Sequence, residues 1–195
     1  MLTVITGPMF AGKSSKLISM ALAHRIAGHY TVCFKPSNDV RYNKNKIATH
    51  DGKTINAIPI DPNIPSQILT RIQEFKPFSD EEIKVVLVDE AQFFESKSLI
   101  KTIEDLLYID GRTIIISGLS QDSSGKPFGA MPHLLAIADD IIHLKAVCSK
   151  SRTIGTATRT FRKDASNTNQ VAVGGPEMYE PRSFNEWLTK SPPII

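Results

Sequence analysis

The stretch "TGPMFAGKSSK", residues 6–16, decides the fold of this chain. Gly7 and Gly12 enclose four residues and are followed by Lys13 and Ser14, which is the spacing of a phosphate-binding P-loop. Such a loop turns its backbone N–H groups toward phosphate oxygens, and the start of the following helix adds partial positive charge. Lys13 is therefore expected at the outer phosphates of a nucleotide, and Ser14 at the Mg²⁺ that accompanies them.

The sequence on either side of the loop has the context that this motif requires. The apolar run 2–6 predicts a short strand before the loop. Apolar residues at three- and four-residue spacing predict a helix after it, and they include Leu17, Ile18, Ala21, Leu22 and Ile26. The alternative, a chance Gly-Lys-Ser turn, would need neither the strand nor the helix.

Length and composition narrow the class of protein. The chain has 195 residues, of which 41% are hydrophobic and 22% charged, so we expect one globular domain with a small appendage. The net charge of +3 suits an anionic small molecule and is weak evidence for nucleic acid. No apolar run approaches about 20 residues, so no membrane partner is expected. Two cysteines give no disulfide framework, and we expect a cytoplasmic protein.

Strand-like and helical patterns alternate along the first three quarters of the chain. Strands are expected at 30–34, 84–89, 112–118 and 140–147, the last as a core strand, and helices at 65–75, 99–107 and 133–138. Residues 36–53 are polar and predict a turn-rich segment. The alternation predicts an α/β fold with a parallel sheet and helices on both of its faces.

The character of the sequence changes after Cys148. The following residues are polar and lack helical periodicity, and a Gly-Gly pair follows at 174–175. We therefore expect a sheet domain at 1–145 and a small lobe of loops and short strands at 146–188. The tail, 189–195, is expected to be disordered.

A second acidic motif, "DEAQFF", follows the apolar run that ends at Val88. P-loop proteins place an acidic residue at this point, close to the phosphates, so Asp89 is expected to share Mg²⁺ with Ser14. Glu90 is expected on the other side of the strand end, where it could serve as a general base. The alternative is that both are solvated acids at the end of a strand.

Four stretches in this order, "GPMFAGKS", "DEAQFF", "KPFGAM" and "YEPR", are similar to the cytosolic type II thymidine kinase family, over residues 1 to about 187. The resemblance implies a RecA-like P-loop sheet and a small lobe with a loop, the lasso, that closes over thymidine. It also implies ATP-dependent phosphorylation of the thymidine 5′-hydroxyl to give dTMP in nucleotide salvage, with ATP and Mg²⁺, by a homotetramer.

The resemblance also implies a role for particular residues. Glu90 would be the base, and Arg41 would stabilise charge on the moving phosphoryl group. The implied ATP-binding residues are Gly7, Pro8, Met9, Phe10, Ala11, Gly12, Lys13, Ser14, Asp39, Arg41, Asp89 and Gln92. The implied nucleoside-binding residues are Met9, Phe93, Leu119, Phe128, Thr158, Val171, Ala172, Val173, Gly174, Gly175 and Tyr179. As alternatives, the apolar members could be ordinary core residues, Tyr179 a packing tyrosine and Arg41 a solvated charge.

The sequence departs from the family at two places. Ser120 and Ser123 stand where the family has an acidic residue and an aromatic that stacks on thymine. In the small lobe, Cys148 is retained, but serine or glutamate stands at the three other positions of a zinc site, namely Ser151, Ser183 and Glu186. Structural zinc needs about four ligands, so no structural zinc is expected. The lobe would then be held by Phe184 and Trp187 packing against the sheet domain, and by substrate bound under the lasso.

Two other functions compete with the kinase. "DEAQ" resembles a helicase motif, which would fit a P-loop ATPase acting on nucleic acid, but the chain is short and shows no basic stripe. The serines at 120 and 123 would fit a catalytically lapsed nucleotide-binding protein. Lys13, Asp89 and Glu90 all being present argues against that reading. We therefore expect a nucleoside and ATP as partners, and no nucleic acid.

Overall fold

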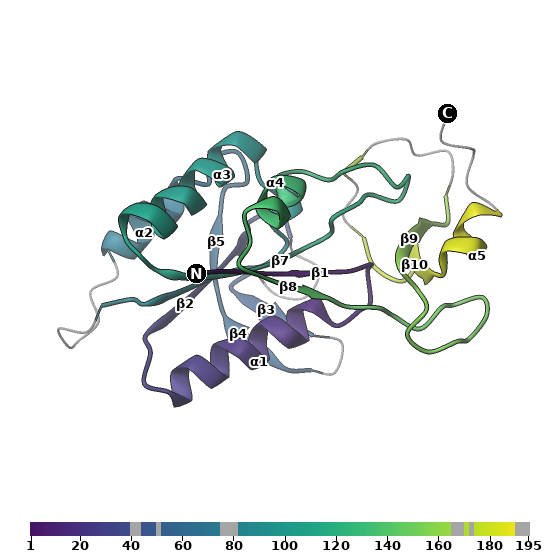
Figure 1. The fold of residues 1–195 in the computed structure, drawn as a ribbon, viewed down its shortest axis with the longest axis horizontal. Helices are drawn as coiled ribbons and strands as arrows, with labels where there is room; N and C mark the ends of the chain where they lie inside the picture. The colour runs from purple at the N-terminus through teal and green to yellow at the C-terminus, as the bar shows by residue number, and fades with distance from the viewer. Residues whose placement is uncertain (40–43, 50–51, 75–81, 165–169, 172–173, 190–195) are drawn as a thin grey trace.

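A six-stranded sheet forms the centre of the computed structural model, which describes residues 1–39, 44–49, 52–74, 82–164, 170–171 and 174–189 (Figure 1). The strands are β1 (Leu2–Thr6), β2 (Thr31–Pro36), β5 (Ile58–Ile60), β6 (Val85–Val88), β7 (Thr113–Gly118) and β8 (Asp140–His143). They lie in the order β5-β2-β6-β7-β1-β8, and every pairing is parallel. The predicted α/β fold is confirmed.

Successive side chains of the buried strands point to opposite faces of the sheet and pack into two apolar layers. In β6, Val86 and Val88 pack into the layer on one face, whereas Val85 and Leu87 pack into the layer on the other. The first layer is covered by α2 (Gln67–Glu74), α3 (Ser96–Glu104) and α4 (Met131–Ala136), and the second by α1 (Lys13–Ile26). Figure 1 shows these helices on opposite sides of the sheet. Continuous apolar runs are what a sheet covered on both faces requires.

Short helical elements connect the strands to these helices. A 3₁₀-helix, η1 (Ala91–Phe93), follows β6, and a π-helical segment, η2 (Asp105–Ile109), continues α3. Glu95 begins α3 as its N-cap, because its carboxylate accepts hydrogen bonds from the backbone N–H groups of Lys97 and Ser98.

Two elements of the sheet domain differ from the sequence prediction. The strand expected at 140–147 ends at His143, and it is an edge strand rather than a core strand, because among the described strands only β1 pairs with it and most of its residues are exposed. On α1, Leu17 and Ile18 are buried, but Leu22 and Ile26 are 47% and 87% exposed. The apolar face of α1 is therefore shorter than its spacing indicates, since the helix extends past the layer that it covers.

The polar segment 36–53 holds more regular structure than expected. Its described residues include β3 (Lys46–Ala48), which pairs antiparallel with β4 (Thr54–Asn56). Ile47 and Ile55 face each other across this hairpin and are both buried beside α1. Two apolar residues in a polar stretch are enough to attach the hairpin to the core.

The C-terminal part forms a small lobe at one end of the sheet (Figure 1). Strands β9 (Arg159–Arg162) and β10 (Tyr179–Arg182) pair antiparallel, and a helix, α5 (Phe184–Leu188), packs on both. The helix was not predicted, because five residues are too few to show helical periodicity. The boundaries drawn at 145 and 188 stay a prediction, and most of the tail, 190–195, lies outside the described residues.

Candidate active site

One pocket of about 270 Å³ lies at the carboxyl ends of β1, β2, β6 and β7, where the lobe faces the sheet. The P-loop, the acidic pair after β6 and the end of β2 line one half of it. The other half is lined by the 119–128 loop and by residues of the lobe, from Thr160 to Tyr179. Ligands of parallel α/β sheets bind at this edge, because the loops after the strands converge there.

The P-loop owes its path to two glycines. Gly7 has φ +147°, and a Cβ on it would lie 2.3 Å from the carbonyl oxygen of Leu144, so only glycine fits. Gly12 precedes α1 with φ +81°, in the left-handed region. At the start of α1, Lys13 donates a hydrogen bond from Nζ to the carbonyl oxygen of Pro8, at 2.8 Å. The loop thus brings a lysine and a helix N-terminus to the same pocket.

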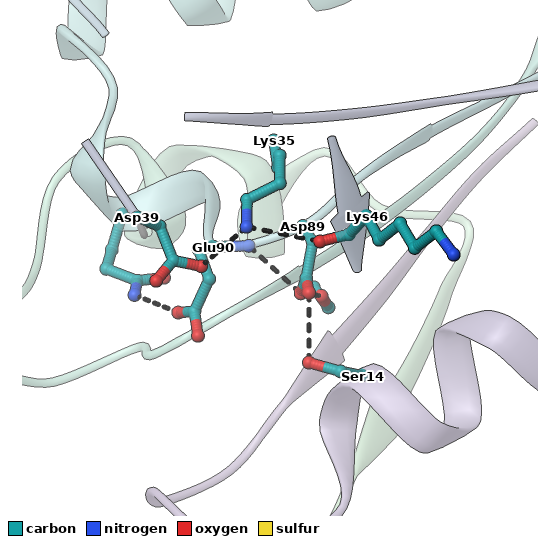
Figure 2. Close-up of polar contacts among 8 residues, drawn as sticks. Ser14, Lys35, Asp39, Lys46, Asp89 and Glu90 are labelled. Carbon is teal, nitrogen blue, oxygen red and sulfur yellow. Dashed lines mark hydrogen bonds and ion pairs between the residues drawn. The ribbon is translucent and has the colours of Figure 1, made fainter. Parts of the chain in front are cut away.

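Asp89 is the buried centre of the acidic motif (Figure 2). Its Oδ2 accepts a hydrogen bond from Ser14 Oγ at 2.9 Å, and its Oδ1 accepts one from Ser117 Oγ. Burial raises the pKa of Asp89 to about 6, and the charge of Glu90 adds to the rise. The hydrogen bonds from Ser117, Ser14 and the Glu90 backbone lower it again. Neutral hydrogen-bond donors therefore hold the carboxylate in place, and they offset only part of the rise in pKa that its burial causes.

Glu90 lines the same pocket as Asp89. Its backbone has φ 52° and ψ 43°, in a region that non-glycine residues rarely adopt. Gln92 fixes the side chain, since its Nε2 donates to Glu90 Oε2 at 2.5 Å. The Oε1 of Gln92 accepts from the backbone N–H of Leu119 at 3.0 Å. Backbone strain of this kind is typical of functional positions.

Lys35 is a buried cation of the pocket that the sequence analysis missed. It lies near the end of β2, 3.4 Å from a carboxylate oxygen of Asp39, and it donates to the carbonyl oxygen of Lys46 at 3.3 Å (Figure 2). Both side chains of the Lys35–Asp39 ion pair are less than 10% exposed. The sequence did hold a signal for this ion pair, namely a lysine directly after the apolar run 30–34. A lysine at the end of a buried strand is expected to have a charged partner, because buried lysines are rare unless they are paired.

The other half of the pocket carries aromatic and backbone groups. Phe93 and Phe128 meet edge to face, with ring centroids 5.9 Å apart, and Leu119 lies beside them in the pocket wall. From the lobe, Arg162 donates to the hydroxyl of Tyr179 at 3.0 Å. An apolar wall with a few polar groups suits a flat, partly polar ring.

The lobe touches the P-loop directly. The backbone N–H of Met9 donates to Thr160 Oγ1 at 3.0 Å, and Thr160 is buried. This hydrogen bond joins the two halves of the pocket close to the phosphate loop.

The pocket brings together many of the residues inferred from the sequence, but not all of them. Those that line it are Met9, Phe10, Gly12, Lys13, Ser14, Asp39, Asp89, Glu90, Phe93, Leu119, Phe128, Gly174 and Tyr179. Those that the structure describes but does not place in the lining are Gly7, Pro8, Ala11, Gln92, Thr158, Val171 and Gly175. Arg41, Ala172 and Val173 lie outside the described residues. Lining residues that were not foreseen include Lys35, Asp122, Thr160, Arg162 and Gln170.

The four positions where the family would hold zinc carry other interactions here. The sulfur of Cys148, which is fully buried, accepts a hydrogen bond from the backbone N–H of Ser183 at 3.2 Å. Ser183 also caps α5 by accepting from the backbone N–H of Glu186 at 3.4 Å. Among residues placed by the structure, no group of three or more His, Cys, Asp or Glu could hold a metal ion.

Phe184 and Trp187, expected to hold the lobe against the sheet domain, behave differently from each other. Trp187 is buried and its Nε1 donates to the backbone carbonyl of Ser123 at 3.0 Å, so it does reach the sheet domain. Phe184 stacks on Trp187 and lies under the guanidinium of Arg159, within the lobe, and is 47% exposed.

Known proteins with similar sequences point to one family. The family model described as "Thymidine kinase" matches residues 1–187. A thymidine kinase of Mycoplasma mobile is 37% identical over 179 residues, which cover 92% of this chain and 82% of that protein. One of Onion yellows phytoplasma is 40% identical over 183 residues, which cover 92% and 82%. One of Pyrobaculum aerophilum is 37% identical over 191 residues, which cover 96% and 98%.

No helix in the described parts of the chain is both long and apolar enough to cross a membrane. The family model covers nearly the whole length, and the P-loop and the acidic motif lie together in one pocket. The chain belongs to the thymidine kinase family.

Proposed function

We propose that this protein transfers the γ-phosphoryl group of ATP to the 5′-hydroxyl of thymidine, giving dTMP and ADP in nucleotide salvage. The observation that carries the proposal is one pocket that holds the Ser14–Asp89 pair, Glu90 and the Phe93–Phe128 pair. Phosphoryl transfer needs the two substrates in line and their charge neutralised, so both must share one enclosed site.

The triphosphate of ATP binds in the P-loop half of the pocket. Backbone N–H groups of the loop and the N-terminus of α1 face the phosphates, and Lys13 exchanges its hydrogen bond to the Pro8 carbonyl for the outer phosphates. Lys35 keeps Asp39 in place at the rim of this half. The pocket then supplies positive charge where the triphosphate is most negative.

Ser14 and Asp89 fit the magnesium ion that ATP carries. A hydroxyl and a carboxylate 2.9 Å apart are hard oxygen donors, which Mg²⁺ prefers, and phosphate oxygens and water complete its shell. Mg²⁺ bound there would neutralise charge on the phosphate oxygens.

Glu90 serves as the general base. The 5′-oxygen forms a bond to the γ-phosphorus, the bond from that phosphorus to the β,γ-bridging oxygen breaks, and the hydroxyl proton passes to the Glu90 carboxylate. Gln92 holds this carboxylate and links it to the Leu119 backbone. A positioned base contributes roughly 10²–10⁴-fold in rate.

Thymidine occupies the half of the pocket beneath the lobe. Phe93, Phe128 and Leu119 form the apolar wall for the base, and Gly174 and Tyr179 close the opposite side. We assign the backbone at Gly174 and Gly175 to the polar edge of the base, because glycines allow close approach. Ser123 provides no ring for stacking, so the edge-to-face phenylalanine pair carries the aromatic contact.

The proposal is tested by incubating the protein with labelled ATP, Mg²⁺ and each deoxynucleoside in turn. Labelled dTMP should form with thymidine, and little product should form with the purine deoxynucleosides. ATP hydrolysis that depends on single-stranded DNA, without dTMP, would favour a nucleic-acid ATPase instead. ATP binding without either reaction would favour a lapsed enzyme.

We also propose, from family resemblance, that the protein is a cytoplasmic homotetramer. Light scattering coupled to size-exclusion chromatography measures the assembly, and a mass of one or two chains at working concentration would contradict it.

A further inference from the structure

The 119–128 loop, which runs from the end of β7 to the residue before Gly129, is built around Asp122. The backbone N–H of Asp122 donates to the carbonyl of Lys126 at 2.9 Å. Its Oδ1 accepts hydrogen bonds from the backbone N–H groups of Ser124 and Lys126, at 2.8 and 3.0 Å. Asp122 is only 7% exposed. One carboxylate oxygen therefore holds the loop in shape and leaves the second for another partner.

That second oxygen faces the lobe and holds Gln170. Gln170 Nε2 donates to Asp122 Oδ2 at 2.8 Å and to the carbonyl oxygen of Pro127 at 3.2 Å. Both partners can only accept, so the amide must present its NH₂ group to them. A hydrogen bond to a charged carboxylate is stronger than one between neutral groups.

This contact lies at the proposed nucleoside half of the pocket. Asp122, Ser123 and Gln170 line the pocket together with Gly174, and Gln170 directly precedes Val171. The same loop contacts the lobe a second time, because the carbonyl of Ser123 accepts the hydrogen bond from Trp187 Nε1. The 119–128 loop carries Leu119 and Phe128 of the apolar base wall, and it also bonds to Gln170 and Trp187 of the lobe.

We propose that Asp122 and Gln170 are positioning residues for the nucleoside, which hold the lobe side of the pocket, where Gln170 and Gly174 lie, at the correct distance from the base wall. This inference rests on the proposed thymidine kinase function. Neither residue reaches the P-loop half, where Ser14 and Asp89 lie. The pair should therefore set the KM for thymidine and leave the KM for ATP nearly unchanged.

The test begins with Gln170→Glu, which keeps the shape of the side chain but turns a carboxylate toward Asp122 and the Pro127 carbonyl. The lost hydrogen bond and the new repulsion should raise the KM for thymidine by about tenfold or more. The KM for ATP should stay within about twofold, because Gln170 bonds to Asp122 and Pro127, which belong to the nucleoside half.

A second substitution separates positioning from a general structural effect. In Asp122→Asn combined with Gln170→Glu, the Asn amide donates to the Glu carboxylate, and its oxygen still accepts from Ser124 and Lys126. The double variant should therefore have a thymidine KM much closer to that of the unmodified protein than the Gln170→Glu variant has. Gln73→Glu, at an exposed position of α2, is the matched control for the change in charge and should behave like the unmodified protein. If Gln170→Glu does not fold, Gln170→Ala removes both contacts without adding charge and should raise the thymidine KM alone.

The outcomes distinguish this inference from the proposed function. If the unmodified protein makes no dTMP, the proposed function fails. If it makes dTMP, but the Gln170 variant changes both KM values equally or neither, the positioning role is overturned. Failure of Asp122→Asn to restore the thymidine KM of Gln170→Glu, with both proteins folded, also overturns it.

Discussion

The two halves of the pocket are built in different ways. The phosphate half comes from two short stretches, 7–14 and 89–92, with Lys35 and Ser117 beside them, and its polar groups are tied together in buried or partly buried hydrogen bonds. The nucleoside half combines a wall from the sheet domain, at 93 and 119–128, with residues of the lobe, at 160–162, 170, 174 and 179, so it is complete only when the lobe docks. We infer that the chemistry is fixed by local structure, whereas the fit to the nucleoside depends on how the lobe is held. The following predictions test this contrast.

The largest effect is expected in the phosphate half. Lys13→Ala removes the charge aimed at the outer phosphates and should lower phosphoryl transfer on the order of 10³-fold or more. Steady-state assays with saturating thymidine measure the loss. Lys16→Ala, on the exposed side of α1, is the matched control and should retain activity. Retention of most activity by the Lys13 variant would remove the basis for the P-loop assignment.

Glu90→Gln should lower kcat at least about 100-fold, the lower range for a lost general base, and leave ATP binding nearly intact. The substitution keeps the shape of the side chain, so a nucleotide-binding titration separates binding from chemistry. A turnover close to that of the unmodified protein would mean that the base lies elsewhere.

A smaller, more selective effect is expected in the nucleoside half. Phe128→Leu keeps most of the buried apolar volume but removes the edge-to-face partner of Phe93. The KM for thymidine should rise roughly two- to tenfold, in line with the strength of an aromatic pair, while the KM for ATP stays constant. Equal changes in both KM values would show that the two halves are not independent.

Asp89 connects activity with stability. Its pKa is raised to about 6, so between about pH 4 and 6 the folded protein binds this proton more tightly than the unfolded chain does. Above that window the ionised carboxylate lowers the free energy of unfolding. Asp89→Asn, without nucleotide or Mg²⁺, should therefore be more stable at pH 7.5 by up to about 3 kcal/mol, although inactive. Thermal melts should show the difference shrinking toward pH 5, and a less stable variant at pH 7.5 would contradict this.

The smallest expected effect is that of a metal chelator on the protein without nucleotide, where we expect no change in stability. The sulfur of Cys148 is engaged by the backbone of Ser183, and Ser183 caps α5. EDTA should leave the melting temperature unchanged, whereas thymidine should raise it by binding the folded state. Metal analysis that finds about one zinc per chain, with loss of the fold on chelation, would show that other ligands had been recruited.

Local sequence patterns were sufficient to predict the strands of the sheet and the residues of the phosphate half. The P-loop needs glycines at positions 7 and 12, directly before Lys13, and buried strands need uninterrupted apolar runs, so both are visible in a short window. The Ser14–Asp89 pair could be expected as well, because a P-loop and an acidic strand end converge at the same edge of a parallel sheet. The resemblance to the thymidine kinases supplied the nucleoside residues but not their arrangement.

Other features were decided by tertiary structure alone. The strand at 140–143 is exposed because it lies at the sheet edge, and Glu90 shares the pocket with Asp89 because its backbone leaves the strand conformation. The contacts of Asp122 with Gln170 and of Met9 with Thr160 join residues 48 and 151 positions apart. No local pattern encodes such pairs, because each depends on how the lobe packs against the sheet. The sequence by itself therefore determined which residues form the proposed phosphate half, and only the packing of distant segments decided which residues form the proposed nucleoside half.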